Sequence, residues 1–407
     1  MTRESPPGPP RIAILGAGPV GLDAALAALE AGHPVDVYEA ARRPAGNLRA
    51  WGHVRLFSPW AMNVSPRMEA WAGRAGVVLP DDPAACPTGD EYLARVVDPL
   101  WKRAFPADRL HLGTRVIGVG REGLLKDEEI GSQERARHRF RILLRDRAGR
   151  ERIVRADLVL DCTGKSGNPN TLGDGGIPAP GEIRLGRRIR RRIPDLRAEP
   201  AAWLGRTLLL AGGGHSAQTV ARDFAEIAAG RDDTRLLWVL RSDAPTWGAV
   251  PEDPLRGRAR LTEAAERLFR GASPCVEVLP GLVVDALEEE NGRLRVRLRG
   301  PGGRRRDVRA DEIVSLTGGV GDHTLYRQLQ VHECYATAGP MKLAQTLLEA
   351  GAVDCLRQPS HGIETLRNPE PKFYLLGDKS YGRNSAFLLT VGWEQVTEVF
   401  GELARRR

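Results

Sequence analysis

The chain has 407 residues, of which 42% are hydrophobic and 28% are charged. This composition is typical of a globular protein and suffices for about two to three domains with their own cores. No apolar run approaches the length that spans a membrane, and the polar, proline-rich start does not resemble a signal peptide. We therefore expect a cytoplasmic protein without a membrane association, with a flexible lead over residues 1–10.

The formal net charge is +8 at pH 7, and arginine contributes most of the positive charge. Basic clusters such as 184–192 and 304–306 carry no interleaved aromatic residues, which a surface for single-stranded nucleic acid needs. The five cysteines are scattered, without a CxxC pair or the spacing of metal ligands. The sequence thus predicts no nucleic-acid partner, no disulfide framework and no metal site.

A glycine turn follows the first apolar strand, residues 12–15, and precedes a helix-forming segment and a second strand. In its GxGxxG pattern, Gly16 permits the tight turn, Gly18 lets a pyrophosphate approach the backbone, and Gly21 lets helix and strand pack closely. The helix N-terminus offers free N–H groups to phosphates. Glu39 ends the second strand, where an acid holds a ribose diol and disfavours a 2′-phosphate. The stretch predicts a site for FAD or NAD rather than NADP.

The loop after Glu39 carries an arginine and then a glycine turn. Such a loop reaches the adenosine and pyrophosphate of a bound dinucleotide in one interpretation and is a solvated loop in the other. The residues that we expect to contact the cofactor around the first turn, besides its glycines and Glu39, are Pro19, Val20, Ala40, Arg42, Asn47, Leu48 and Val116.

An apolar strand that ends in Thr163-Gly164 is repeated later as a strand that ends in Thr317-Gly318. Small residues at such a strand end let the backbone come close to a cofactor, so these four residues are included among the predicted cofactor contacts. A stretch rich in proline and glycine follows the first of these strands and is typical of a linker. The chain is therefore expected to leave a first domain and return to it. We predict a first domain from 11–170 and 317–407, a linker at 171–205 and an inserted domain at 206–316.

The inserted domain begins with a second glycine turn, in which Gly212, Gly214 and Ala217 take the three glycine positions. His215 and Ser216 lie between them and are expected to contact the same cofactor. The following strand ends on Arg241-Ser242 instead of an acid. A guanidinium and a hydroxyl suit a ribose 2′-phosphate, so we favour an NADP site over a solvated strand end.

A last apolar strand ends in Gly377-Asp378 and is followed by a helix that closes the chain. An acid beside a glycine at a strand end can bind a ribityl hydroxyl or reach a pyrophosphate through water. The alternative is an ordinary surface turn, since glycine and aspartate are both common in turns. We favour the binding role and include both residues in the predicted cofactor site.

In this order the motifs resemble those of the two-dinucleotide-binding flavoproteins and, within them, the flavin-containing monooxygenase-like group. The resemblance covers nearly the whole chain and implies an α/β fold, with an FAD-binding Rossmann-like domain and an inserted NADPH-binding Rossmann-like domain. It also implies that NADPH, with NADH as an alternative, reduces FAD. A flavin C4a-(hydro)peroxide formed with O2 would then oxygenate a small-molecule substrate. Homodimer formation is left open.

Residues 51–63 combine two tryptophans and a phenylalanine with several polar side chains, directly after the first strand–helix–strand unit. Clustered aromatic residues often mark a buried corner of a core, but this position favours the wall of a pocket for a flat ring system. The candidates for lining the flavin or orienting the substrate, including one arginine near the end of the chain, are His53, Arg55, Trp60, Asn63 and Arg383.

The chain departs from the family's FxGxxxHxxx(F/Y/W) fingerprint, because the corresponding region has no phenylalanine and carries Arg190 in place of the histidine. The absence of a CxxC pair removes the dithiol that thioredoxin reductase chemistry needs. Three functions stay open, of which we favour the first. They are a flavin monooxygenase, a reductase or oxidase that passes electrons to an acceptor or partner, and a non-catalytic dinucleotide-binding redox sensor.

Overall fold

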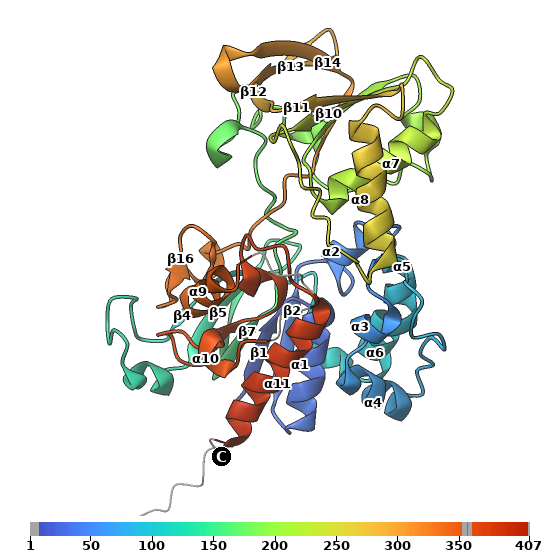
Figure 1. Ribbon diagram of the computed structural model, residues 1–407. Coiled ribbons are helices and arrows are strands. Elements are labelled where there is room, and N and C mark those ends of the chain that lie inside the picture. Colours follow the sequence, from blue (N-terminus) through green and yellow to red (C-terminus); the bar gives the residue numbers. More distant parts are fainter. Residues whose placement is uncertain (1–7, 352–355, 357–359, 406–407) are drawn as a thin grey trace, which may run out of the picture. The chain divides into compact units, whose positions relative to one another are not determined.

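The computed structural model describes residues 8–351, 356 and 360–405 (Figure 1). Most of the expected lead over residues 1–10 therefore lies outside the described residues. The chain divides into two compact units, which we describe separately. The first unit comprises residues 1–52, 58–168 and 320–407, and the second comprises residues 53–57 and 169–319.

The first unit contains a five-stranded parallel sheet in the order β18-β7-β1-β2-β3. Its strands are β1 (Ile12–Leu15), β2 (Val35–Glu39), β3 (Leu110–Leu112), β7 (Leu158–Asp161) and β18 (Phe373–Leu375). The central strands are buried on both faces, as their uninterrupted apolar sequences require. Helices α1 (Pro19–Glu30) and α11 (Leu389–Arg405) lie side by side in this unit (Figure 1).

The remaining elements of the first unit include a three-stranded antiparallel sheet and a short hairpin. These strands are β4 (Arg115–Arg121), β5 (Phe140–Arg145), β6 (Glu151–Ala156), β16 (Glu333–Cys334) and β17 (Gly339–Pro340). The α-helices are α2 (Gly46–Arg49), α3 (Trp60–Asn63), α4 (Pro66–Ala75), α5 (Gly89–Tyr92), α6 (Asp98–Arg103), α9 (Met341–Glu349) and α10 (Ile363–Leu366). A π-helical turn is formed by Leu93–Val97, and 3-10 turns by Ala107–Arg109, Gln133–Arg137, Thr324–Tyr326 and Gly377–Tyr381.

The second unit repeats this plan with a parallel sheet in the order β11-β10-β9-β15-β8 and an antiparallel sheet of three strands. The parallel strands are β8 (Ile189–Arg190), β9 (Thr207–Ala211), β10 (Arg235–Leu240), β11 (Val276–Pro280) and β15 (Glu312–Ser315). The antiparallel strands are β12 (Val283–Glu290), β13 (Arg293–Arg299) and β14 (Arg305–Ala310), and the helices are α7 (His215–Ile227) and α8 (Arg256–Phe269). Its 3-10 turns are Asp174–Gly176, Gly186–Arg188, Pro200–Ala202 and Pro301–Gly303.

Each unit therefore has a Rossmann-like strand–helix–strand start, and the second is inserted into the sequence of the first. The expected α/β fold with one Rossmann-like domain inserted into another is confirmed. Each unit also has its own hydrophobic core. Two core clusters lie within the first unit, and the two clusters of the second unit use only residues between Leu172 and Val314.

The segment 171–205, which we expected to be a linker, is instead part of the second unit. Ile189 in this segment pairs with Ile313 and so adds β8 to the edge of the parallel sheet. Trp203 is buried in one of the cores of the same unit. The boundaries of the large inserted segment consequently fall at 168/169 and 319/320, and the second unit also takes residues 53–57. None of the described helices is long and apolar enough to cross a membrane.

Candidate functional site

The first glycine turn uses its three glycines for two different purposes. Gly16 has a φ of +96°, and a Cβ atom there would lie 2.8 Å from the carbonyl oxygen of Cys162. A Cβ on Gly21 would lie only 2.1 Å from the carbonyl oxygen of Gly16. At Gly18, by contrast, a Cβ would meet no atom within 4 Å. Gly16 and Gly21 are thus required by packing, whereas Gly18 faces open space, as a position for a phosphate requires.

Helix α1 begins without a side-chain cap. Its N-cap is Gly18, and no acidic residue stands in its first turn. Helices α4 and α5, in contrast, are capped by Ser65 and Thr88, whose hydroxyl oxygens accept hydrogen bonds from Met68 N and Glu91 N. The first N–H groups of α1 are therefore left for an external acceptor, which is the arrangement that binds phosphates at helix N-termini.

Glu39 connects the end of β2 to this turn. Its Oε2 accepts a hydrogen bond from Ala17 N at 2.9 Å, and its Oε1 accepts one from Ala41 N at 2.8 Å. An ionised carboxylate has about four acceptor positions, so these two bonds leave capacity for a ribose diol. The carboxylate is half-buried and fixed by its own loop, which suits a group that holds a ligand in one orientation.

The other residues expected around the first turn lie in different environments. Ala40 and Arg42 are exposed, and Arg42 forms no hydrogen bond or ion pair with any residue that the structure describes. Asn47 is half-buried, whereas Leu48 belongs to the core of the first unit. Pro19 and Val20 form the first turn of α1, and Val116 is a half-buried residue of β4, at a bulge in its pairing with β5.

Two further strand ends complete the site of the first unit. Thr163 follows β7 and donates its hydroxyl to Asp161 Oδ1 at 2.6 Å, and Gly164 after it has a φ of +67° with open space around it. Gly377 follows β18 and packs against Val20, since a Cβ there would lie 3.2 Å from its side chain. Because parallel strands share one carboxyl edge, these residues lie on the same side of the sheet as the glycine turn.

Asp378 is the acid that we expected beside Gly377. Its Oδ1 forms an ion pair with Lys165 Nζ at 2.7 Å, while its Oδ2 accepts no hydrogen bond from the described residues. Burial raises the pKa of Asp378, and the Lys165 charge acts in the opposite direction. The sequence interpretation missed Lys165, although it directly follows the Thr163-Gly164 pair, because lysines after strands are usually solvated.

The second glycine turn repeats the first. Gly212 has a φ of +130°, and a Cβ there would lie 2.3 Å from the carbonyl oxygen of Leu316. Gly214 is the N-cap of α7, which again has no side-chain cap, and a Cβ on Gly214 would meet nothing within 4 Å. Ala217 is fully buried in the position of the third glycine. The second unit thus also presents an uncapped helix start beside open space.

His215 and Ser216 form the first two positions of α7. Ser216 is exposed, whereas the ring of His215 packs edge-on against Phe57 of the same unit, with 5.6 Å between centroids. Burial lowers the pKa of His215, and its buried Nε2 has no partner in the described part of the chain. Gln218, which the sequence interpretation missed, donates to Gly213 O and Trp247 O, both at 2.9 Å. These bonds connect the glycine turn to the loop that contains Trp247.

The end of β10 presents the groups that we expected for a 2′-phosphate. Arg241 and Ser242 are exposed, and Arg241 forms no hydrogen bond or ion pair within the described ranges. Ser242 Oγ accepts a hydrogen bond from Ala244 N at 3.2 Å. Arg304 adds a second guanidinium beside this loop, because its Nη2 lies 3.9 Å from Asp243 Oδ1. Arg304 comes from a later hairpin, so its position could not be inferred from the glycine pattern.

Thr317 and Gly318 are hydrogen-bonded to Asn170, in the segment that enters the second unit. Thr317 Oγ1 donates to Asn170 O at 3.3 Å, and Gly318 O accepts a hydrogen bond from Asn170 N at 2.9 Å. These bonds hold together the two chain segments that enter and leave the second unit. The structure therefore gives Thr317 and Gly318 a connecting role, and their expected cofactor contacts remain predictions.

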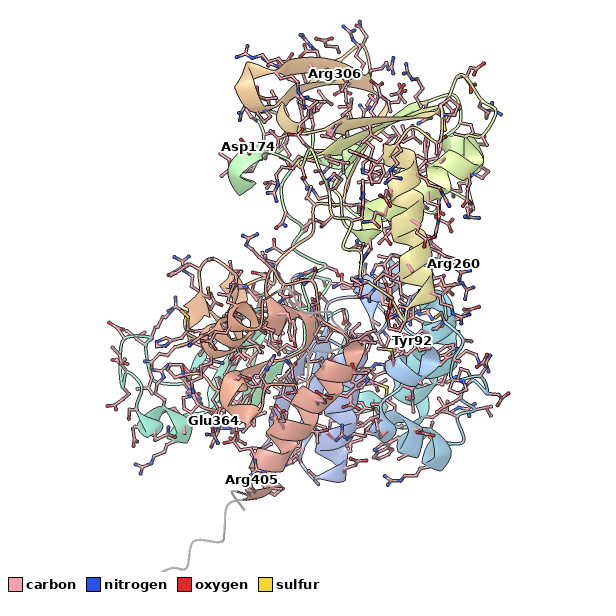
Figure 2. All side chains as sticks on the ribbon, in the orientation of Figure 1. Tyr92, Asp174, Arg260, Arg306, Glu364 and Arg405 are labelled. Atoms are coloured by element: carbon pink, nitrogen blue, oxygen red, sulfur yellow. The ribbon has the colours of Figure 1, made fainter. Side chains whose placement is uncertain are left out.

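Trp60 and Asn63 are buried in the first unit. The side-chain amide of Asn63 donates to Ser58 O and Pro59 O at 2.9 and 2.8 Å, so both of its N–H groups are used. Tyr92, labelled in Figure 2, donates its hydroxyl to Asn63 O and packs edge-on against the buried Trp60. The expected roles of Trp60 and Asn63 beside the flavin or substrate remain predictions.

The remaining reaction candidates are divided between the two units. His53 and Arg55 belong to the second unit, whereas Arg383 belongs to the first. His53 is half-buried, and its Nε2 is buried without a partner among the described residues. Arg55 and Arg383 are exposed, and the main-chain N–H of Arg383 donates to Thr337 O at 2.7 Å. Their expected roles remain predictions.

A cavity of about 680 Å³ in the second unit does not coincide with its glycine turn. It is lined by the C-terminal turns of α7 and α8 and by the starts of β10 and β11, including Arg222, Arg267 and Cys275. The glycine turn follows the other end of a strand of the same sheet. The uncapped helix start, rather than this cavity, is therefore the candidate nucleotide site of the unit.

No protein-family model matches the chain, and no curated protein matches its sequence. Its fold, in contrast, is similar to those of many solved structures. The bacillithiol disulfide reductase from Bacillus cereus is 16% identical, with a TM-score of 0.69 over 98% of this chain and 99% of that chain. The ornithine N-hydroxylase from Kutzneria sp. 744, described with reduced FAD, NADP+ and L-ornithine, is 15% identical, with a TM-score of 0.64 over 98% and 99%.

A flavin-containing monooxygenase from Stenotrophomonas maltophilia is 17% identical, with a TM-score of 0.55 over 98% of both chains. At these identities the comparisons show the fold alone. The fold is that of the two-dinucleotide-binding flavoproteins, so the resemblance drawn from the motifs is confirmed at this level. These neighbours include both reductases and monooxygenases.

Proposed function

We propose that the chain is an FAD-dependent oxidoreductase that consumes NADPH. The observation that carries this proposal is the pair of uncapped glycine turns with opposite groups at the next strand end. Glu39 follows the first turn and suits an unmodified ribose, whereas Arg241 and Ser242 follow the second and suit a 2′-phosphate. A chain with two nucleotide sites of different ribose preference fits electron transfer from one dinucleotide to another.

The residues of the first unit fit FAD. The N–H groups around Gly18 and in the first turn of α1 would hold the pyrophosphate, and Glu39 would accept hydrogen bonds from the adenosine ribose. The free Oδ2 of Asp378 would accept one from a ribityl hydroxyl. Bound FAD supplies the hydride-accepting chemistry, for which the protein's side chains have no equivalent.

The residues of the second unit fit NADPH in the same way. The first turn of α7, behind Gly214, would bind the pyrophosphate, while Arg241, Ser242 and Arg304 surround the end of β10. Arginine suits this role because its planar guanidinium forms charge-assisted hydrogen bonds with phosphate oxygens. NADH would lack this contact and would bind more weakly.

We propose a monooxygenase reaction as the specific activity. In it, NADPH, a proton, O2 and a small organic substrate are consumed, and NADP+, water and the oxygenated substrate are produced. The motif order shared with flavin-containing monooxygenases supports this choice. Exclusion of water from the reacting centre is the contribution that such a reaction requires from the protein.

A reductase that passes electrons to a small acceptor is the second candidate, and Arg190 favours it. This residue stands where the monooxygenase fingerprint has a histidine. Its Nε lies 3.5 Å from Glu312 Oε2, and its guanidinium lies over the ring of Trp203, 5.0 Å from the centroid. Arg190 thus contacts other residues of the second unit, and the histidine of the monooxygenase fingerprint is missing at this position.

The test is to load the purified protein with FAD, reduce it with NADPH without oxygen and then mix it with oxygenated buffer. Flavin absorbance, NADPH consumption and hydrogen peroxide are followed with a panel of small amines and thioethers. An oxygenated product that matches NADPH consumption supports the monooxygenase. Peroxide in equal amount, or fast reduction of a quinone instead, supports the reductase, and no reduction by either nicotinamide contradicts enzymatic function.

A further inference from the structure

Two crossed ion pairs connect the ends of the neighbouring strands β7 and β18 in the first unit. Asp161 ends β7, and Lys165 follows it four residues later. Asp378 and Lys379 lie in the 3-10 turn that follows β18. Lys379 Nζ lies 2.7 Å from Asp161 Oδ2, and Lys165 Nζ lies 2.7 Å from Asp378 Oδ1. Each strand end therefore supplies one acid and one lysine, and each acid is paired with the lysine of the other strand.

The inner pair, Lys379 and Asp161, is closed to any ligand. Both side chains are fully buried. The three N–H groups of the Lys379 ammonium are used by Asp161, by Asp322 O at 2.7 Å and by Thr163 Oγ1 at 3.3 Å. Asp161 also accepts hydrogen bonds from the main chain and hydroxyl of Thr163. This pair fixes the two strand ends relative to each other.

The outer pair, Lys165 and Asp378, has a free acceptor. Lys165 Nζ donates to Gly382 O at 3.3 Å and to Asn384 O at 3.0 Å in addition to its ion pair, so its ammonium is fully engaged. Asp378 has only this one partner among the described residues, and a third of its side chain is exposed. The lysine thus has no capacity left for a ligand, whereas the carboxylate retains Oδ2.

The charge of Asp378 lies near the turn where the proposed pyrophosphate would bind. The preceding residue, Gly377, packs against Val20 in the first turn of α1, where the proposed FAD pyrophosphate would bind. A carboxylate beside this turn would repel an anionic pyrophosphate unless a positive charge compensated it. The Lys165 ammonium supplies that compensation without occupying the remaining carboxylate oxygen.

We propose that Lys165 is a positioning residue of the FAD site, which neutralises Asp378 so that this carboxylate can bind a cofactor hydroxyl without repelling the pyrophosphate. The inference rests on the proposed binding of FAD to the first unit. Lys165 acts through Asp378 and does not touch the cofactor. The effect of removing Lys165 should therefore depend on whether residue 378 still carries a charge.

The experiment is a double-mutant cycle on the FAD dissociation constant of the apoprotein, measured by flavin fluorescence at low salt. The variants are Lys165→Met, Asp378→Asn and the two combined, with Lys126→Met as the control. Lys126 is an exposed lysine of the same unit that donates to Arg327 O, so its removal changes the net charge equally. Lys165→Gln is a second variant, which keeps an N–H donor and lacks the charge.

We expect Lys165→Met and Lys165→Gln to weaken FAD binding by about tenfold or more, as the loss of a charge-assisted interaction does. The double variant should bind FAD within about threefold of Asp378→Asn, because the charge that Lys165 compensates is then absent. Lys126→Met should bind like the original protein. Melting temperatures of the apoproteins identify any variant that does not fold.

Two results would overturn the inference while leaving the proposed function intact. In one, both Lys165 variants bind FAD as the original protein does. In the other, the double variant binds FAD at least tenfold more weakly than Asp378→Asn, which indicates that the lysine acts through its bonds to Gly382 and Asn384. If the original protein itself does not bind FAD, the proposed function fails, and the inference that rests on it fails too.

Discussion

Gly18 and Gly21 stand in one turn, but a methyl group on each would meet different surroundings. A Cβ on Gly21 would collide with Gly16 O, whereas a Cβ on Gly18 would enter open space. We therefore expect Gly21→Ala to destabilise the protein without ligand by about 1–3 kcal/mol or more, as overpacking does. Gly18→Ala should leave this stability nearly unchanged and weaken FAD binding at least tenfold, because its methyl group occupies the proposed phosphate position.

Urea unfolding of the apoproteins and FAD titration separate the two effects. Gly73→Ala, on the surface of α4 with no atom within 4 Å of its added Cβ, is a matched control for both measurements. If Gly18→Ala binds FAD as tightly as the original protein, no phosphate lies at this turn.

Arg241 is the residue on which the choice between NADPH and NADH depends. We expect Arg241→Ala to raise the KM for NADPH by about ten- to hundredfold, which corresponds to about 1.5–3 kcal/mol for one charge-assisted phosphate contact. The KM for NADH should change little, since NADH has no 2′-phosphate. Steady-state kinetics of flavin reduction with both nucleotides provide the measurement.

Arg305→Ala is the control, because Arg305 is an exposed arginine of the same unit without a hydrogen bond or ion pair in the part that the structure describes. Its removal changes the net charge equally. Equal increases of KM for NADPH and NADH in Arg241→Ala would contradict the phosphate role.

For single residues, local patterns predict those positions whose surroundings depend on neighbours in sequence. Gly16, Gly18 and Gly21 follow from the geometry of one turn, and the structure gives each the surroundings expected from its position. Lys165 and Arg304 could not be predicted, because they reach their sites through pairs more than fifty residues apart in the chain. Aromatic residues such as Trp60 fit both interpretations in sequence, since a core and a pocket wall have similar compositions; the structure shows Trp60 buried.

Among the elements, the ends of β7 and β18 are held by the buried pair Lys379 and Asp161. Removing one charge from a fully buried pair leaves the other uncompensated, and this typically costs about 3–5 kcal/mol. We expect Lys379→Met to lower the free energy of unfolding by this amount in urea unfolding followed by circular dichroism. Lys379→Met combined with Asp161→Asn should recover part of the loss, because no buried charge then lacks a partner.

A loss below about 1 kcal/mol in Lys379→Met would show that the pair is dispensable. The matched comparison is Lys165→Met, since Lys165 pairs with Asp378 at the same strand ends and both side chains are partly exposed. Its stability loss should be smaller, because a partly exposed ion pair is less desolvated than a fully buried one.

Long apolar strands beside glycine turns were predictable as elements, whereas short edge strands were not. The sequence around β8 is rich in arginine and proline, and only two of its residues pair with β15. Such a segment has no period that distinguishes it from a linker, so its place in the second unit is decided by tertiary packing. Leu185, Ile189 and Trp203 are buried there and anchor it.

In the whole molecule, the insertion architecture was predictable because the same strand–turn pattern occurs twice, and the Thr-Gly pair that ends each half marks where the chain leaves and returns. The exact boundaries depend on contacts that no local pattern contains. Pro169 and Gly319 form an antiparallel bridge, and Val320 N donates to Asn168 O at 3.2 Å. The chain thus enters and leaves the second unit at neighbouring points.

These neighbouring ends lead to a prediction about the separated units. Because each core cluster lies within one unit, a fragment of residues 169–319 should fold alone, with a single cooperative thermal transition. It should bind 2′,5′-ADP about tenfold or more tightly than 5′-AMP in titration calorimetry, since the two ligands differ in the phosphate that Arg241 is proposed to bind.

The complementary chain, in which a short glycine linker joins Asn168 to Val320, should bind FAD but should not be reduced by NADPH. Its own clusters remain complete, and the break requires only a short closure, because Val320 N is hydrogen-bonded to Asn168 O. Phe57 loses its contact with His215 in this chain, so its stability is compared with that of Phe57→Ala in the full protein. Reduction of the shortened chain by NADPH at the original rate would show that the second unit is not the nicotinamide site.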